Sequence, residues 1–343
     1  MTAYRDRTPV IVLTGFLGSG KTTLLNRLLK SPHLAHSAVL INEFGDIGID
    51  HQLVGAVNET TVVLESGCIC CTIRDDLKTA ILDLHDRRAR GELPAFRRIV
   101  LETTGLADPV PVLHTLASDP QLQYHYRVAS VVTAVDAVNA RTQFIEFDEA
   151  VKQVLVADAL VVTKRDLASA GSFKDLRARL ATMNPTATVF DARAQDFSVQ
   201  DLLATDAYGE HAAARLSALP SAVQPPTHSS HHAEDLYSFS VIDPTPFDWS
   251  AFGVWLTMLL HAHGESILRV KGLLNVAGAD TPVAINGVQH VVHPPFHLAA
   301  WPDDDHRSRI VFIVRGLARE RIEQSFACFR DLLINPLAVG SSL

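Results

Sequence analysis

The sequence lacks the features that would place the protein on a nucleic acid or in a membrane. Lys and Arg total 30 against 38 Asp and Glu, so the formal net charge is −8. The chain therefore has no excess of positive charge with which to bind nucleic acid or anionic lipid. No apolar run approaches the roughly 20 residues that a membrane-spanning helix needs. The first residues, MTAYRDRTPVIVL, contain no signal-peptide core followed by a cleavage site of small residues. We therefore expect a cytoplasmic protein that binds neither nucleic acid nor membrane.

Cysteine is also scarce, and its distribution argues against a disulfide framework. Three of the four cysteines fall within residues 66–71, SGCICC, while Cys328 stands far away. Thiols this close together cannot staple distant parts of a chain, so we expect them to be reduced. What three adjacent thiols are for depends on the rest of the sequence.

The pattern of apolar and polar residues changes twice along the chain. From residue 9 to residue 205 short apolar segments alternate with longer amphipathic ones, which is typical of a parallel sheet covered by helices on both faces. Residues 206–235 are rich in Ala, Ser, Pro and His without a sustained period, which favours a linker. We therefore predict an α/β domain at residues 1–205, a linker at 206–235 and a smaller α+β domain at 236–343.

The stretch GFLGSGKT at residues 15–22 fits the pattern G-x-x-x-x-G-K-[ST] of a phosphate-binding loop. An apolar strand pattern precedes it and a helical pattern follows it, as this loop requires. Its glycines let backbone N–H groups close round a phosphate chain at a helix N-terminus, where the dipole also favours anions. Lys21 is predicted to reach the β- and γ-phosphates, and the Thr22 hydroxyl to bind Mg²⁺. The sequence thus predicts a P-loop NTPase fold with nucleotide-binding residues Gly15, Gly18, Ser19, Gly20, Lys21, Thr22 and Thr23.

A P-loop site also needs an acidic residue at the end of a neighbouring strand, to hold the metal ion or its water. The stretch RIVLETTG supplies Glu102 directly after four strand residues, and Gly105 lets the backbone approach a γ-phosphate. Because the acid is Glu rather than Asp, we expect it to contact Mg²⁺ through water. The predicted catalytic residues are Lys21, Thr22 and Glu102.

The stretch ALVVTKRDL places Thr163, Lys164 and Asp166 just beyond a further strand. A carboxylate there can accept hydrogen bonds from N1–H and the N2 amino group of guanine, while a lysine stem packs on the ring. Adenine lacks both donors, so it would leave the carboxylate without partners and would be rejected. The pattern favours GTP and argues against an ATP-dependent kinase.

With a nucleotide site in place, Cys68, Cys70 and Cys71 indicate a metal site. Their spacing brings two or three sulfurs to one soft cation, and thiolates select Zn²⁺ and similar metals over Mg²⁺. A closed structural zinc site needs four ligands, and the sequence holds no second cysteine pair. The cluster therefore indicates an open site, suited to a metal that must leave again. Glu43, in the segment LINEFGDIGID, either completes this thiolate site or contacts the nucleotide Mg²⁺.

Five segments in this order, GFLGSGKTTLLNRLL, INEFGDIGID, ESGCICC, ETTGLADP and TKRDL, resemble those of the CobW-type P-loop GTPases. The later stretch from SFSVIDPTPFD to SRIVFIVRGL is similar to the C-terminal domain of that family. The resemblance implies a metallochaperone in which GTP and Mg²⁺ create a site for Zn²⁺, or alternatively Co²⁺, on the three thiolates. Hydrolysis would release the metal to a client metalloprotein. No arginine finger is identifiable, so we expect slow intrinsic turnover.

The sequence leaves other interpretations open. A regulatory GTPase could carry these cysteines as structural residues, and a metal buffer could bind mainly through the linker histidines His228, His231 and His232. The metal could also be cobalt, delivered for cobalamin synthesis or to a nitrile-hydratase-type enzyme. A monomer and a homodimer are equally compatible with the sequence.

Overall fold

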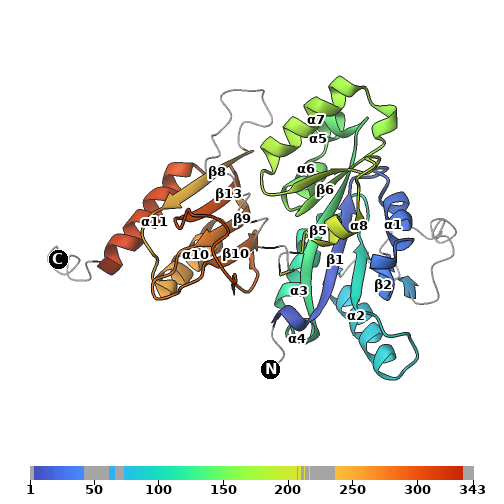
Figure 1. The fold of residues 1–343 in the computed structure, drawn as a ribbon, viewed down its shortest axis with the longest axis horizontal. Helices are drawn as coiled ribbons and strands as arrows, with labels where there is room; N and C mark the ends of the chain where they lie inside the picture. The colour runs from blue at the N-terminus through green and yellow to red at the C-terminus, as the bar shows by residue number, and fades with distance from the viewer. Residues whose placement is uncertain are drawn as a thin grey trace. The chain divides into compact units, whose positions relative to one another are not determined.

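A computed structural model describes residues 4–41, 62–65, 73–206, 208–209, 212, 216 and 236–334 of the chain. The chain divides into two compact units, Met1–Ala212 and Ala213–Leu343, and each is built on its own sheet (Figure 1). The division falls inside the stretch predicted as a linker. The predicted boundaries at residues 205 and 235 stay a prediction.

The first unit is built on seven parallel strands in the order β3-β2-β4-β1-β5-β6-β7. Strands covered on both faces need near-continuous apolar runs, and β5, YRVASVVTAVD, is buried at every position. The strands are β1 (Thr8–Gly15), β2 (Ser37–Ile41), β3 (Val62–Glu65), β4 (Arg98–Glu102), β5 (Tyr126–Asp136), β6 (Ala159–Thr163) and β7 (Thr188–Asp191).

Helices cover both faces of this sheet. Leu25 of α1 packs in one core cluster with Val161 of β6, whereas Val162 packs in another with Leu180 of α7. Neighbouring strand residues thus point to opposite, equally covered faces, which confirms the predicted P-loop NTPase fold class. The helices are α1 (Lys21–Leu29), α2 (Ile73–Ala89), α3 (Val110–Ser118), α4 (Pro120–His125), α5 (Ala140–Glu146), α6 (Asp148–Leu155), α7 (Ala170–Met183) and α8 (Val199–Leu203), with 3₁₀ turns at Tyr4–Asp6, Pro32–Leu34 and Arg165–Leu167.

The carboxyl ends of the parallel strands meet at one edge of the sheet, where open α/β proteins bind their ligands. Strands β1, β4, β5 and β6 end there at Gly15, Glu102, Asp136 and Thr163. The register brings these ends within a few residues of one another, because Leu13 pairs with Glu102, Gly15 with Ala134, and Asp136 with Thr163. The sheet therefore gathers segments that lie far apart in the sequence.

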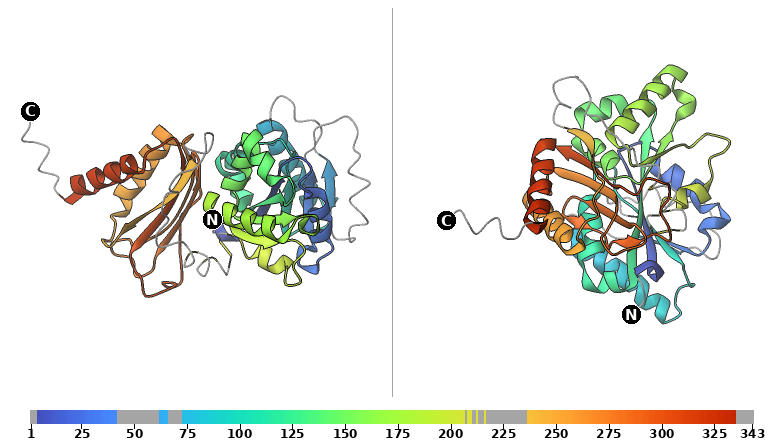
Figure 2. Two further views of the ribbon diagram at one scale, coloured as in Figure 1. Left: turned by 90° about the horizontal axis from the view of Figure 1, so that it is seen from above. Right: turned by 60° about the vertical axis from the view of Figure 1, so that its left-hand side comes forward.

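The second unit is a six-stranded antiparallel sheet in the order β11-β10-β9-β13-β8, with β12 paired to β10. Helices α10 and α11 of this unit lie on one face of the sheet (Figure 2). Trp255 of α10 and Phe326 of α11 pack with their rings 4.8 Å apart, and Trp255 also meets Phe312 of the sheet. This α+β architecture was predicted. The elements are β8 (Leu236–Asp243), α10 (Trp249–His263), β9 (Ile267–Leu274), β10 (Val283–Val288), β11 (Val291–Val292), β12 (Phe296–His297), β13 (Ser308–Arg315) and α11 (Arg319–Ile334).

The helices in the described part of the chain include none that combines the length and the apolar character required for crossing a membrane.

Candidate functional site

The loop between β1 and α1 has the backbone geometry that a phosphate-binding loop needs. Gly20, the residue before α1, has a φ of 87°, in the left-handed region that side chains disfavour. At Gly15 a Cβ would lie 2.5 Å from the carbonyl oxygen of Ala134, on the neighbouring strand. Both glycines are therefore required by the path of the loop, and α1 begins directly behind it at Lys21.

The Lys21 ammonium lies inside this loop. Its Nζ donates to the carbonyl oxygen of Gly15 at 3.0 Å and to that of Phe16 at 3.5 Å, and the residue is 8% exposed. A Cβ on Gly105 would lie 3.1 Å from Nζ. The lysine therefore stands between the P-loop and the segment after β4, where a terminal phosphate would need its charge.

Thr22 and Glu102, which are both predicted to serve a magnesium ion, lie within hydrogen-bond distance of each other. The Thr22 hydroxyl donates to Glu102 Oε1 at 3.2 Å, and Glu102 is 1% exposed. Hydroxyl and carboxylate oxygens are hard ligands that suit Mg²⁺. This pair fits a nucleotide-bound magnesium ion better than a soft metal.

The segment after β4 is held between the P-loop and α6. Gly105 is buried, and a Cβ there would lie 2.7 Å from Leu17 Cα, so only glycine allows this approach. From the other side, Gln153 Nε2 donates to the carbonyl oxygens of Gly105 and Ala107 at 3.2 and 3.0 Å. Sequence reasoning missed Gln153, because a glutamine within an amphipathic helix carries no motif.

The predicted base-binding residues lie at the end of β6, beside the P-loop. The Thr163 hydroxyl donates to the carbonyl oxygen of Ser19 at 2.6 Å, so this threonine ties the loop to the sheet. Lys164 Nζ donates to the carbonyl oxygen of Gly18 and to Asp136 Oδ2, each at 2.7 Å. Sequence reasoning also missed Asp136, although a carboxylate ending an apolar strand is the signal that identified Glu102.

Asp166, the predicted guanine acceptor, is half exposed and pairs with Arg193 at 3.4 Å. Arg193 follows β7, and neither its type nor its position had been predicted to matter. Both partners are well exposed, so the pair contributes little to stability and can be exchanged for another hydrogen-bonding partner.

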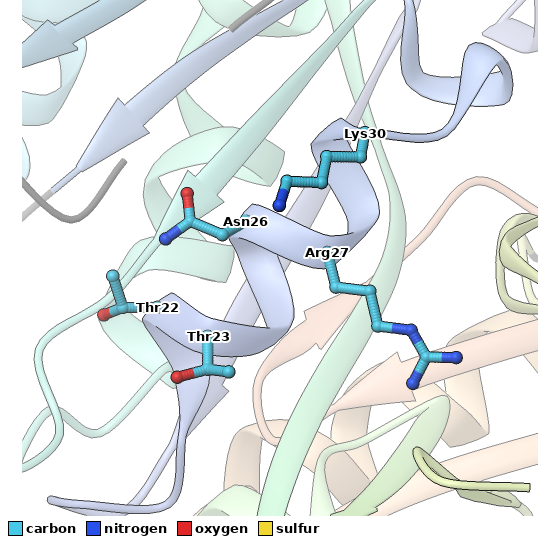
Figure 3. Close-up of a pocket in the computed structure, with 5 residues that line it drawn as sticks. All are labelled: Thr22, Thr23, Asn26, Arg27 and Lys30. Carbon is cyan, nitrogen blue, oxygen red and sulfur yellow. The ribbon is translucent and has the colours of Figure 1, made fainter. Parts of the chain in front are cut away.

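A pocket of about 330 Å³ lies along α1, beginning at the first turn after the P-loop. Figure 3 shows Thr22 and Thr23 on that turn, with the remaining lining residues on the turns that follow. The lining residues are Thr22, Thr23, Asn26, Arg27 and Lys30. Two of them are the residues predicted to bind phosphate and Mg²⁺, so this space adjoins the nucleotide site.

The predicted metal ligands Cys68, Cys70, Cys71 and Glu43 lie outside the described residues, as do the linker histidines His228, His231 and His232. Within the described part of the chain, no group of three or more His, Cys, Asp or Glu side chains could hold a metal ion. The structure describes the elements on either side of the cysteine segment. The cysteine segment runs from the end of β3, at the edge of the sheet that carries the P-loop, to the start of α2.

The chain matches two family descriptions. Residues 9–191 match the CobW/HypB/UreG nucleotide-binding domain, and residues 236–330 match the cobalamin synthesis protein cobW C-terminal domain. Together they account for both units.

Similar proteins have names that concern zinc. The zinc chaperone YjiA of Escherichia coli is 35% identical over 322 residues, which cover 94% of this chain and 98% of that protein. The zinc-regulated GTPase metalloprotein activator 1 of Schizosaccharomyces pombe is 35% identical over 214 residues, covering 60% of this chain and 50% of that protein. The zinc chaperone CobW of a Sinorhizobium species is 26% identical over 340 residues, covering 91% of this chain and 94% of that protein.

Among solved structures, that of the Zn(II)-bound YjiA GTPase from Escherichia coli is similar at a TM-score of 0.72. It is 32% identical in sequence, and the match covers 95% of this chain and 99% of that one. Fold, both domain matches and near full-length similarity agree, and the chain belongs to the CobW/HypB/UreG family.

Proposed function

We propose that this protein is a GTP-hydrolysing zinc chaperone. In its Mg-GTP state it binds Zn²⁺ on the thiolates of Cys68, Cys70 and Cys71, and hydrolysis releases the metal to a client metalloprotein. The near full-length similarity to a zinc chaperone supports the cargo, and the family supports the GTPase.

One observation carries the proposal further than the similarity does. The contact of Thr22 with Glu102 and the lysine between the P-loop and Gly105 form a γ-phosphate-sensing edge. β3 ends at the same edge, one residue before the SGCICC segment begins. This position supports the proposal that a change in nucleotide acts on the segment that begins at the next residue and carries the three thiols.

The residues of the site divide the work of hydrolysis between them. Lys21 and the loop amides neutralise the β- and γ-phosphates, while Thr22 and Glu102 provide oxygen ligands for Mg²⁺ and its water. Bound Mg²⁺ would neutralise charge that develops on the phosphate oxygens. No covalent step is needed, since phosphoryl transfer depends mainly on positioning and electrostatics. Without an arginine finger in the predicted site, turnover of the isolated protein is slow.

Guanine recognition rests on Asp166 and Lys164. The half-exposed Asp166 carboxylate accepts hydrogen bonds from the two N–H groups of the base edge. Its ion pair with Arg193 breaks when the base binds. Adenine offers no such donors, so GTP is the nucleotide.

Release of phosphate from GTP and ATP tests the enzymatic part. The wild-type protein should hydrolyse GTP slowly and ATP much more slowly. Lys21→Ala should reduce GTP turnover about 100-fold or more, because the charge facing the terminal phosphate is lost. Lys174→Ala removes an exposed lysine of α7 and is the matched control. Equal turnover in Lys21→Ala and wild type would contradict the assignment.

Zinc retention under anaerobic conditions tests the cargo. The variant with Cys68→Ser, Cys70→Ser and Cys71→Ser should lose the tight zinc site that forms with a Mg-GTP analogue. Deletion of residues 225–235, which carry the linker histidines, should leave it in place. The reverse result would identify a histidine-based metal buffer instead, and tighter Co²⁺ binding would make cobalt the cargo.

A further inference from the structure

A buried carboxylate stands beneath the base-binding lysine. Asp136 ends β5 and is 1% exposed. Its Oδ1 accepts the backbone N–H groups of Val138 and Asn139 at 2.8 and 3.2 Å. Its Oδ2 accepts the Asn139 side-chain amide at 2.8 Å and the Lys164 ammonium at 2.7 Å. Both oxygens of this carboxylate therefore accept hydrogen bonds from the protein itself.

Lys164 is held at both ends. Its backbone adopts a left-handed conformation, with φ 53°, which is uncommon for a residue with a side chain. Its ammonium donates to Asp136 and, at 2.7 Å, to the carbonyl oxygen of Gly18 in the P-loop. The side chain nevertheless stays 35% exposed, so the stem remains open to a ligand.

Three segments thus converge on one ammonium group: the P-loop, the end of β5 and the end of β6. A lysine side chain without such partners samples many rotamers, and fixing it on binding costs entropy. In this protein the Lys164 side chain is already fixed before a ligand binds. A ligand that packs on the lysine stem therefore binds more tightly.

We propose that Asp136 is a positioning residue for guanine binding, which holds the Lys164 ammonium against Gly18 so that the lysine stem forms one fixed face of the base pocket. The inference rests on the proposed binding of GTP. Asp136 itself does not touch the nucleotide. It acts through Lys164 on the base and through Gly18 on the shape of the phosphate loop.

The charge state of Asp136 agrees with this role. Burial alone would raise the pKa of this carboxyl, but the hydrogen bonds from Lys164, Asn139 and the backbone outweigh it and lower the pKa. The group is therefore ionised at neutral pH and retains the ion pair with Lys164. Asparagine has the same shape and can still accept from the backbone, but it removes the negative charge.

A double-mutant cycle on the full chain tests the inference. GDP affinity is measured calorimetrically for wild type, Asp136→Asn, Lys164→Met and the double variant. Each single substitution should weaken GDP binding about tenfold, and the double variant should be no weaker than Lys164→Met alone, because the two residues act as one unit. A merely structural aspartate would give additive losses.

Two further variants make the result decisive. Asp158→Asn replaces another buried aspartate, directly before β6, whose Oδ2 accepts the Val131 N–H at 2.9 Å, and it should leave GDP affinity unchanged. Asp136→Glu keeps the charge but moves the carboxylate, so it should weaken GDP binding while the protein stays folded, and it replaces Asp136→Asn in the cycle if that variant does not fold.

The outcomes separate this inference from the proposed function. Wild-type protein that does not prefer GDP to ADP would overturn both. Normal guanine preference in wild type, with unaltered GDP affinity or additive losses in the Asp136 variants, would overturn only the role of Asp136.

Discussion

Thr163 shows how a single hydroxyl links the proposed base-binding end of the site to the phosphate-binding loop. It stands where asparagine is the more familiar residue of GTPases. Its hydroxyl donates to the carbonyl oxygen of Ser19 at 2.6 Å, and the carbonyl oxygen of Val135 lies 3.2 Å from the same hydroxyl. Its methyl group lies beside Gly20, 3.8 Å from the position of a Cβ there. Threonine thus joins the P-loop to β5 and β6 with a side chain shorter than asparagine.

Asp166 is the residue proposed to select the base, and its replacement should change that choice. Asp166→Asn removes the charged acceptor for the two guanine N–H groups, so GDP affinity should fall about 10- to 100-fold. The asparagine amide can donate to the C2 oxygen of xanthine, so affinity for xanthosine diphosphate should rise. Competition between the two nucleotides measures both changes. Unaltered GDP affinity would show that Asp166 does not read the base.

His125 should make the stability of the first unit sensitive to acid. Burial in the fold, and then the neighbouring charge of His85, lower the pKa of His125 below its ordinary value of 6.5, and the two rings lie 4.0 Å apart. In the window below 6.5 the unfolded chain binds more protons at this position than the folded chain. The contribution of His125 to the free energy of unfolding is therefore fully present above pH 6.5 and is lost as the pH falls below 6.5.

The variant His125→Phe keeps an aromatic ring against His85 and removes the titration. Its free energy of unfolding should fall less on acidification through pH 6.5 than that of wild type, as measured by urea unfolding at several pH values. GDP affinity should not change, since α4 leads into the start of β5, at the opposite edge of the sheet from the P-loop. Identical pH profiles for the two proteins would rule out His125 as the responsible group.

At the scale of elements, α6 supports the segment that is predicted to face the γ-phosphate. Two successive residues hold that segment: Gln153 donates to Gly105 and Ala107, and Lys152 pairs with Asp108 at 3.3 Å. Gln153 is 1% exposed, and since both partners are carbonyl oxygens, its amide nitrogen must face them. The helix therefore fixes the backbone next to Gly105.

Gln153→Leu should separate GTP binding from GDP binding. Loss of the donor removes a hydrogen bond from the carbonyl groups of buried Gly105 and partly buried Ala107 and loosens the Gly105 segment, so affinity for a GTP analogue should fall about tenfold. GDP lacks the γ-phosphate, which is the group that the Gly105 segment is predicted to face. The GDP affinity of the variant should therefore stay within about twofold of that of wild type. Gln200→Leu, at an exposed position of α8, is the control. Equal losses for both nucleotides would indicate general damage to the fold instead.

The elements themselves could be predicted well from the sequence, because each depends on local pattern. Continuous β-branched runs indicated the parallel strands, and the glycines of residues 15–22 indicated the loop at which α1 begins. Asp136, Gln153 and Arg193 were missed for a physical reason. Their partners Lys164, Gly105 and Asp166 lie 28, 48 and 27 residues away, and only the strand order brings them together.

At the scale of the whole molecule, two separate cores indicate two units that fold independently. The first unit packs its helices on a parallel sheet, and the second packs α10 and α11 on an antiparallel sheet of its own. Asp206 belongs with the first unit, since it forms a bidentate ion pair with Arg127 at 2.7 and 2.8 Å. The nucleotide site draws all of its described residues from the first unit.

A fragment of residues 1–212 should therefore fold and bind GDP without the second unit. Its GDP affinity should lie within about threefold of that of the full chain, because domains with their own cores can fold alone. Circular dichroism and calorimetry provide the measurement, and a fragment ending at residue 205 is the control. The control should be less stable, because it lacks the Asp206 carboxylate that pairs with buried Arg127. An unfolded 1–212 fragment would contradict independent folding.

The proposed coupling of nucleotide and zinc must be reciprocal. If Mg-GTP tightens zinc binding by some factor, then zinc must tighten Mg-GTP binding by the same factor, whatever path connects the two sites. This constraint applies to the protein as a whole and provides an internal check on any measured coupling.

The most direct test of the central claim is an anaerobic competition titration with Zn²⁺. It compares the protein alone, with Mg-GDP and with a non-hydrolysable Mg-GTP analogue, each beside the variant with serine at positions 68, 70 and 71. A nucleotide-gated carrier predicts zinc affinity at least about tenfold higher with the GTP analogue only, a coupling of about 1.4 kcal/mol, and no such gain in the variant. Equal zinc affinity in all three nucleotide states would contradict the account.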